Sequence, residues 1–156
     1  MRTPLALLLA AIAPLAAAQA PAVSKVELQR CGLYESREGA REDDAQSPSG
    51  KRRIVHDNRL TKETLHVPAR EGTKFGCEIV LHGTPEGAQA QFRAVLRLPP
   101  GSPRAQLAGS QSYAIGALGY VGYTFRNPAL LVAGPWTLQV WVQEKKLAEK
   151  TFTVTR

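Results

Sequence analysis

The stretch GPWTLQVWVQEKKLAEKTFTV, Gly134–Val154, decides the fold class. In residues 136–143 apolar side chains alternate with polar ones, and an extended chain places the apolar set on one face: Trp136, Leu138, Val140 and Val142. The return segment 147–155 alternates in the same way, and a turn is expected around 144–146. The stretch is therefore predicted to be a β-hairpin with one buried face and one solvated face.

The remaining sequence carries similar short segments, separated by glycine, proline and other turn residues. In the first of them the alternation changes phase near Gln29 and Arg30, which predicts a β-bulge or bend. No amphipathic helical stretch of useful length follows the first 20 residues. The fold class is predicted to be all-β, an immunoglobulin-like antiparallel β-sandwich, with a small β-barrel as the alternative. The segments with this pattern are 23–35, 63–69, 75–81, 90–98 and 112–125.

Residues 1–20, MRTPLALLLAAIAPLAAAQA, have the features of an export signal. A basic residue, Arg2, precedes an apolar run, and small residues provide two cleavage positions, after Ala18 or after Ala20. The run is too short to be a membrane anchor, and no later segment has about eighteen consecutive apolar residues. We therefore predict a signal peptide over 1–20, a single domain over 21–156 without a transmembrane segment, and a periplasmic or secreted location.

Charged residues are concentrated in residues 36–53, SREGAREDDAQSPSGKRR, which contain no large apolar side chain. Such a segment buries too little apolar surface to offset the entropy lost on ordering, so a mobile charged surface loop is predicted. The whole chain has a formal net charge of +7, which favours solubility or association with an anionic glycan of the envelope. The basic run 51–53 lacks interleaved aromatic residues, so nucleic acid is not expected as a partner.

The sequence contains two cysteines, Cys31 and Cys77. An oxidising compartment outside the cytoplasm favours their joining in a disulfide. In segment 75–81, Cys77 shares the apolar face and is expected to point into the core, where a structural cystine is favoured over a reactive thiol. Closing the loop between the two cysteines is expected to stabilise the fold by about 4 kcal/mol.

Four elements combine glycine, proline and aromatic residues at predicted strand and turn positions: LHVPAREGTKFG (65–76), GYTFRNP (122–128), GPWTLQVW (134–141) and LAEKTFTV (147–154). In this order they resemble the elements of a family of small bacterial exported proteins that is catalogued only as a domain of unknown function. The resemblance spans residues 23–156 and implies a compact β-sandwich without known catalytic residues. The charged segment 36–53 and the cysteine pair are not part of the family pattern.

The histidines are the main candidates for chemistry, and the sequence has three: His56, His66 and His82. No Gly-x-Ser-x-Gly turn and no His-Glu-x-x-His helix is present, so the protein is predicted not to be an enzyme and to use no cofactor. His66 and His82 are expected at solvent-facing strand positions, where they could meet and bind copper or zinc with a third ligand. A periplasmic metal-handling protein is the alternative function, against histidines that are structural or incidental.

Trp141 departs from the alternation, because it lies on the polar face of its strand. With Tyr113, Tyr120 and Tyr123 it is predicted to form a shallow patch that binds a protein or a sugar ring. The competing interpretation places Trp141 under the charged loop or over side chains of its own sheet. These features together predict a monomeric, non-catalytic binding or accessory module of the bacterial cell envelope, whose partner is an envelope protein or an anionic glycan.

Overall fold

The computed structural model describes residues 19–43 and 51–156. The predicted signal peptide, 1–20, lies outside this range apart from its last two residues, and it stays a prediction. Within the described residues, no helix is long and apolar enough to cross a membrane. The strands are β1 (Ala22–Asp43), β2 (Lys51–Glu63), β3 (His66–Pro68), β4 (Lys74–Thr84), β5 (Gln89–Arg97), β6 (Gln106–Ala114), β7 (Leu118–Thr124), β8 (Gly134–Val142) and β9 (Lys145–Thr155), with a 3-10 helix, η1 (Pro128–Leu130), before β8.

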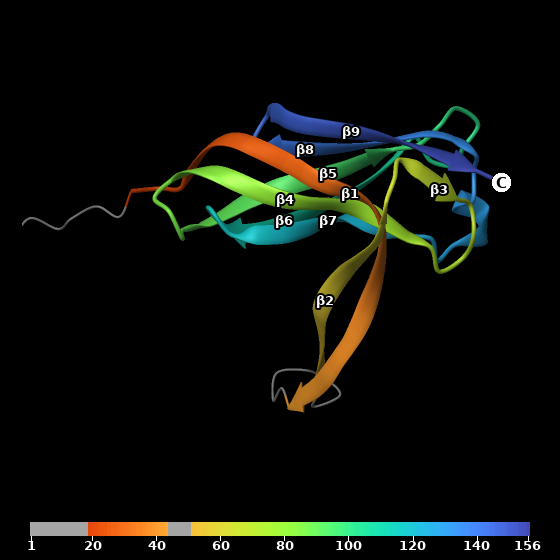
Figure 1. The fold of residues 1–156 in the computed structure, drawn as a ribbon. Coiled ribbons are helices and arrows are strands. Elements are labelled where there is room, and N and C mark those ends of the chain that lie inside the picture. Colours follow the sequence, from red (N-terminus) through yellow and green to blue (C-terminus); the bar gives the residue numbers. More distant parts are fainter. Residues whose placement is uncertain (1–18, 44–50) are drawn as a thin grey trace, which may run out of the picture.

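The strands form two sheets that pack face to face (Figure 1). One sheet has the order β2-β1-β4-β7 and the other the order β3-β9-β8-β5-β6. Neighbouring strands are antiparallel, except that β3 pairs with β9 in parallel. The prediction of a β-sandwich is therefore confirmed, and the barrel alternative is wrong because the two sheets remain separate.

An aromatic cluster fills the space between the sheets. At its centre Trp136 on β8 is 0% exposed, and its Nε1 donates a hydrogen bond to the Val132 carbonyl oxygen at 2.9 Å. The ring lies 5.2 Å from Phe125 and 6.1 Å from Phe75, both in edge-to-face geometry. Phe152 on β9 completes the cluster, 5.0 Å from Phe75. The buried face predicted for the last hairpin is thus confirmed, and burying such large rings is a major source of stability.

The final hairpin turns one position earlier than the pattern predicted. Its turn lies at 143–144, because β9 already begins at Lys145. Gln143 adopts a positive φ of 55°, the backbone conformation that tight hairpin turns require. For the segment 112–125 the pattern predicted two short strands or one interrupted strand, and the structure has two: the end of β6 and the whole of β7, which belong to different sheets.

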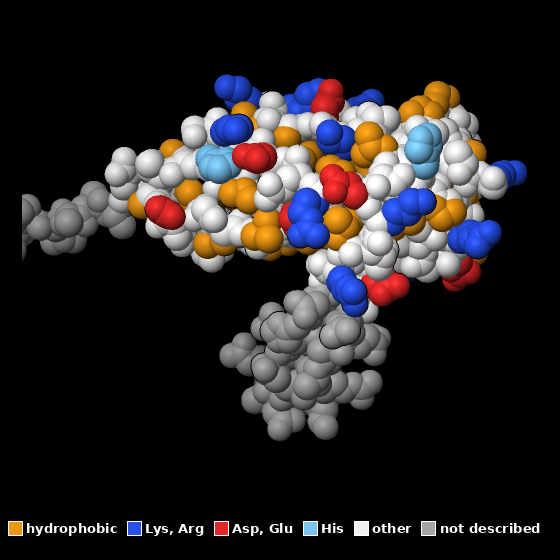
Figure 2. Space-filling model, viewed as in Figure 1, with side chains coloured by type: hydrophobic (Ala, Val, Ile, Leu, Met, Phe, Trp, Pro, Cys, Tyr) orange, Lys and Arg blue, Asp and Glu red, His pale blue; other side chains and the backbone are white. Residues whose placement is uncertain are grey.

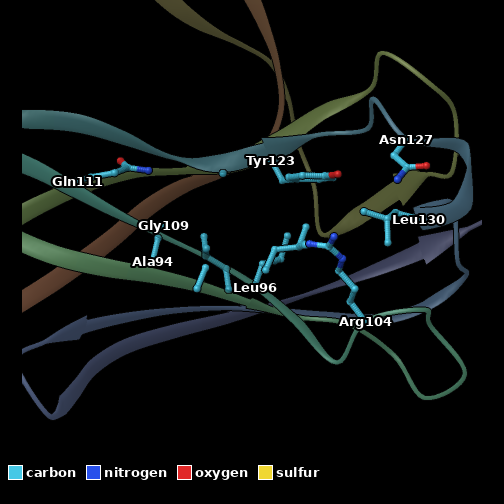
Figure 3. A pocket seen from close by; sticks show the side chains of 12 residues that line it. Ala94, Leu96, Arg104, Gly109, Gln111, Tyr123, Asn127 and Leu130 are labelled. Carbon is cyan, nitrogen blue, oxygen red and sulfur yellow. The ribbon is translucent and has the colours of Figure 1, made fainter.

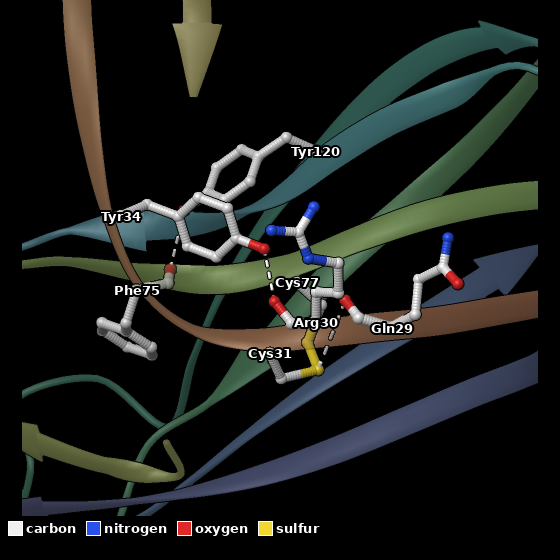
Figure 4. Close-up of a disulfide and its surroundings, with 7 residues drawn as sticks. All are labelled: Gln29, Arg30, Cys31, Tyr34, Phe75, Cys77 and Tyr120. Carbon is white, nitrogen blue, oxygen red and sulfur yellow. Dashed lines mark hydrogen bonds between the residues drawn. A yellow bond between two sulfur atoms is a disulfide. The ribbon is translucent and has the colours of Figure 1, made fainter. Parts of the chain in front are cut away.

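The predicted bulge in the first strand is confirmed, and it positions the disulfide. The register of β1 against β4 shifts between Gln29 and Gly32, and Arg30 has a φ of 46°. This shift moves Cys31 onto the inner face, where it is bonded to Cys77 (Figure 4). The two cysteines are separated by 46 residues in sequence and by 4.1 Å between Cα atoms. Both are buried, as predicted for a structural cystine.

The charged segment 36–53 differs from the irregular loop that we predicted. The backbone of β1 continues to Asp43, and β2 begins at Lys51, so both form a two-stranded ribbon that extends beyond the sandwich (Figure 1). Antiparallel pairing satisfies backbone groups without a buried apolar face, which composition alone does not reveal. At the base of the ribbon the paired positions Glu35 and Arg59 also hold residues of opposite charge. Residues 44–50 lie outside the described range.

The disulfide generates a stability prediction. Replacing both cysteines, Cys31→Ala with Cys77→Ala, is expected to lower the free energy of unfolding by about 4 kcal/mol, because the unfolded chain regains the entropy of an open loop. Guanidinium denaturation followed by tryptophan fluorescence measures this loss. Wild-type protein kept in reductant is the matched control and should lose a similar amount. An unchanged denaturation midpoint would show that the cystine does not stabilise the fold.

Candidate functional site

Trp141 lies on the outer face of the five-stranded sheet and covers part of that face. Its Nε1 donates a hydrogen bond to Gln139 Oε1 at 3.2 Å. Gln139 is paired with Val95 on β5, which is only 2% exposed although it does not belong to the core cluster between the sheets. Gln139 itself is 9% exposed. This arrangement matches the competing interpretation, in which Trp141 lies over side chains of its own sheet.

Two of the three predicted tyrosines point into the sandwich. Tyr113 on β6 packs against the core, 5.6 Å from the ring of Phe92, and its hydroxyl donates to the carbonyl oxygen of Tyr120 at 2.7 Å. Tyr123 on β7 stacks on Trp136, with ring centroids 6.0 Å apart. Both rings are therefore mainly structural.

The third tyrosine, Tyr120, lies on the outer face of the four-stranded sheet. Its hydroxyl donates to the Phe75 carbonyl oxygen at 2.9 Å, and its ring meets the edge of Tyr34 at 4.8 Å. Burial raises the pKa of the Tyr120 hydroxyl. Because Trp141 lies on the outer face of the other sheet, the structure does not bring the four predicted residues together in one patch.

The two candidate metal ligands are also separated. His66 is on β3 of the five-stranded sheet, whereas His82 is on β4 of the four-stranded sheet, where its Nε2 lies 3.2 Å from Glu27 Oε2. Charged side chains of both signs are scattered over the face seen in Figure 2, with the histidines in two distant places. Among the described residues, no three His, Cys, Asp or Glu side chains gather in a way that could hold a metal ion.

A groove opens between the two sheets on the side where β6 and β7 form their edges (Figure 3). Its volume is about 470 Å³, within the range of sites that hold small ligands or a few side chains. The lining is mostly apolar or small, with three longer polar side chains, Arg104, Gln111 and Asn127. The apolar and small residues of the lining are Ala94, Leu96, Leu107, Ala108, Gly109, Gly122, Leu130 and Leu138.

The edge strands beside this groove lack the usual protection against pairing. Edge strands normally carry lysine, proline, a bulge or an inward-pointing charge, which prevent another strand from adding to the sheet. The sequence of β6, QLAGSQSYA, has no charged residue and no proline, and its register against β5 shows no shift. The sequence of β7, LGYVGYT, is also uncharged, and Leu118 at its start is 59% exposed.

Polar groups gather at one end of the groove. Asn127 uses its Oδ1 to cap η1 by accepting from the Ala129 amide at 3.0 Å, which leaves its amide nitrogen as a donor. The guanidinium of Arg104 reaches into the groove toward the same end as the hydroxyl of Tyr123 (Figure 3). No acid of the described chain forms an ion pair with Arg104. The sequence did not predict Arg104 and Asn127 as site residues. The one signal that pointed to this edge is the run 106–114, QLAGSQSYA, which contains no charged residue.

A second polar cluster lies where the ribbon of β1 and β2 leaves the sandwich. The Nζ of Lys74 donates to Ser36 Oγ at 2.5 Å and to Asn58 Oδ1, and it sits 4.7 Å above the ring of Tyr120. Burial, together with the charge of Arg126, lowers the pKa of Lys74. These contacts join β4 to both ribbon strands, so the cluster has a structural role.

Tyr34 is the other titratable group of this cluster. Its hydroxyl donates to the carbonyl oxygen of Arg30 at the β1 bulge (Figure 4). Burial, with a further contribution from the negative charge of Glu78, raises the pKa of Tyr34 to about 12. The bulge, the disulfide and this hydrogen bond therefore lie within one short section of β1.

Two mainly antiparallel sheets packed face to face over one core define an immunoglobulin-like β-sandwich. The crystal structure of an immunoglobulin-like protein from Pseudomonas aeruginosa is similar, with a TM-score of 0.56 and 28% sequence identity. The match covers 86% of this chain and 99% of that one. Residues 22–154 match a domain of unknown function, DUF3859, and the chain belongs to this family. A search of curated proteins finds no match.

The raised pKa of Tyr34 predicts a pH dependence of stability. Below pH 10 the hydroxyl is protonated in both the folded and the unfolded chain, so the free energy of unfolding does not depend on it. Between pH 10 and about 12 the unfolded chain loses this proton first, so the stability should fall as pH rises. Denaturation midpoints measured across this window should fall more steeply for wild type than for Tyr34→Phe. Equal slopes would contradict the assignment.

Proposed function

We propose that the protein is a non-catalytic binding module of the bacterial envelope that holds an extended segment of another protein in the groove between β6 and β7. The observation that carries the proposal is the apolar groove of about 470 Å³ beside an uncharged, regular edge strand. The predicted signal peptide supports a periplasmic or secreted location for this activity. Export also explains the use of a cystine in a domain of this size.

The chemistry of the lining supports recognition rather than catalysis. The groove residues include no Ser, Cys, His, Asp or Glu, the groups that act as nucleophiles and general bases. Its polar groups are a guanidinium, two amides and the hydroxyl of Tyr123, which orient a ligand by hydrogen bonding. No observation of the described chain favours the alternative of metal handling, because its two histidines lie in different sheets.

The shape of the site supports an extended protein segment as its ligand. An added strand on β6 would satisfy the free backbone groups of that edge, while alternate side chains of the strand would point into the groove. Main-chain hydrogen bonds then supply affinity and the groove supplies selectivity. The small residues Ala94 and Gly109 leave the space that such side chains would fill.

Filling the groove is the direct test. A Cβ placed on Gly109 meets no atom within 4 Å, so Gly109→Phe should fold and occupy the groove. Ser110→Phe adds the same ring to the next, exposed position of β6, whose side chain points to the opposite face. Random decapeptides displayed on phage should yield binders to the wild-type protein that Gly109→Phe no longer captures and Ser110→Phe still does.

Trp141→Ala provides a second comparison for the same peptides. Because Trp141 lies on the outer face of the sheet, this variant should capture them as the wild type does. Thermal unfolding would verify that all variants are folded. Loss of capture by Trp141→Ala with normal binding by Gly109→Phe would move the site to the outer face and overturn the proposal, as would failure to select any groove-dependent peptide.

A further inference from the structure

We infer that the segment held in the groove is the C-terminus of a partner protein, whose free carboxylate binds Arg104 and whose last side chain, an apolar one, enters the groove. This inference rests on the proposed function and specifies its ligand. Three independent features of the described chain support it: the direction of β6, the charge of the groove and the cluster of donors at one end.

The direction of β6 determines which end of an added strand meets Arg104. β6 runs from Gln106 to Ala114, and the five-stranded sheet continues antiparallel from β8 through β5 to β6. A strand added in the same antiparallel sense would run from the level of Ala114 to the level of Gln106. Its C-terminal end would therefore arrive beside Arg104, which precedes β6 by two residues and lines the groove.

The charge of the groove selects a carboxylate. Arg104 is the single charged residue of the lining, and both edge strands are uncharged. A guanidinium next to apolar walls favours a planar anion that accepts two parallel hydrogen bonds, and a carboxylate has this geometry. Electrostatic complementarity thus points to a negative group at the end of the ligand rather than along its length.

Additional donors at the same end would complete the recognition of a chain terminus. The amide nitrogen of Asn127 and the hydroxyl of Tyr123 lie near the guanidinium of Arg104 (Figure 3). A terminal carboxylate has two oxygens with several acceptor positions. A single guanidinium does not occupy all of them, so further donors can bind the same group. Leu96 and Leu130 also line the groove and provide apolar walls for the last side chain.

The test compares two phage libraries of random octapeptides, one displayed with a free C-terminus and one fused to the coat protein at both ends. Binders that Gly109→Phe does not capture should come from the first library alone and should end in an apolar residue. The selected peptides are then synthesised as free acids and as C-terminal amides, and their affinities for the wild-type protein are measured by fluorescence anisotropy. Amidation should weaken binding about tenfold or more, the effect of removing a charge-assisted hydrogen bond.

Arg104→Gln should weaken binding of the acid by a similar factor and leave the affinity for the amide unchanged. Arg97→Gln is the matched control, because it removes the same charge from an exposed position on β5 and should affect neither peptide. Groove-dependent peptides that bind equally well as acid and amide would overturn this inference and leave the proposed function intact. The absence of any groove-dependent peptide from both libraries would overturn both.

Analytical ultracentrifugation of the wild-type protein tests a different occupant of the same edge. Two copies could pair along β6 without any free carboxylate. A monomer–dimer equilibrium that Gly109→Phe abolishes, and that the selected acids do not displace, would replace the partner C-terminus with a second copy and overturn the inference. A monomer that binds the acids supports it.

Discussion

The aromatic cluster in which Trp136 packs against Phe75 and Phe125, and Phe152 packs against Phe75, is the interaction on which the rest of the structure depends. In the described part of the chain no strand is paired across the two sheets, so side chains between the sheets must hold the sandwich together. The cystine does not replace this packing, because Cys31 and Cys77 lie on β1 and β4, neighbours within one sheet. It constrains the chain next to the bulge, whereas the hallmark disulfide of antibody domains links the two sheets.

The same packing leaves the groove open. Large rings meet near Trp136, while the side bounded by β6 and β7 presents small residues such as Ala94 and Gly109. Small side chains do not fill the space between the two sheets as the aromatic rings do, so a groove remains along the side bounded by β6 and β7. One of its walls is fixed to the core, because Tyr123 stacks on Trp136 and lines the groove as well. A pre-formed site of this kind loses little entropy on binding.

Two glycines of the segment 112–125, Gly119 and Gly122, make room for tyrosine rings rather than for a flexible surface. A Cβ on Gly119 would lie 2.6 Å from the Tyr113 ring, and one on Gly122 would lie 2.2 Å from the hydroxyl of Tyr120. In the sequence, the combination of glycine and tyrosine indicated an aromatic binding patch. In the structure, the glycines instead allow the tyrosine rings to pack against the backbone. The alternation of side chains within the strand was sufficient to place Trp136 on the buried face, but it does not tell which sheet a strand joins.

The sequence by itself determined most strands of the sandwich but not β2, and it determined the buried face of β8, the bulge near Arg30 and the cystine. Each of these depends on local alternation or on the presence of two cysteines alone. Only the tertiary structure decided that β6 and β7 are edges of different sheets, and that Arg104 and Asn127 meet at the end of the groove between them. It also decided that Trp141 covers its own sheet, since its neighbour Gln139 is paired with Val95 from a distant segment. Strand pairing joins residues far apart in the chain, and the alternation of side chains within one strand does not identify the strand that pairs with it.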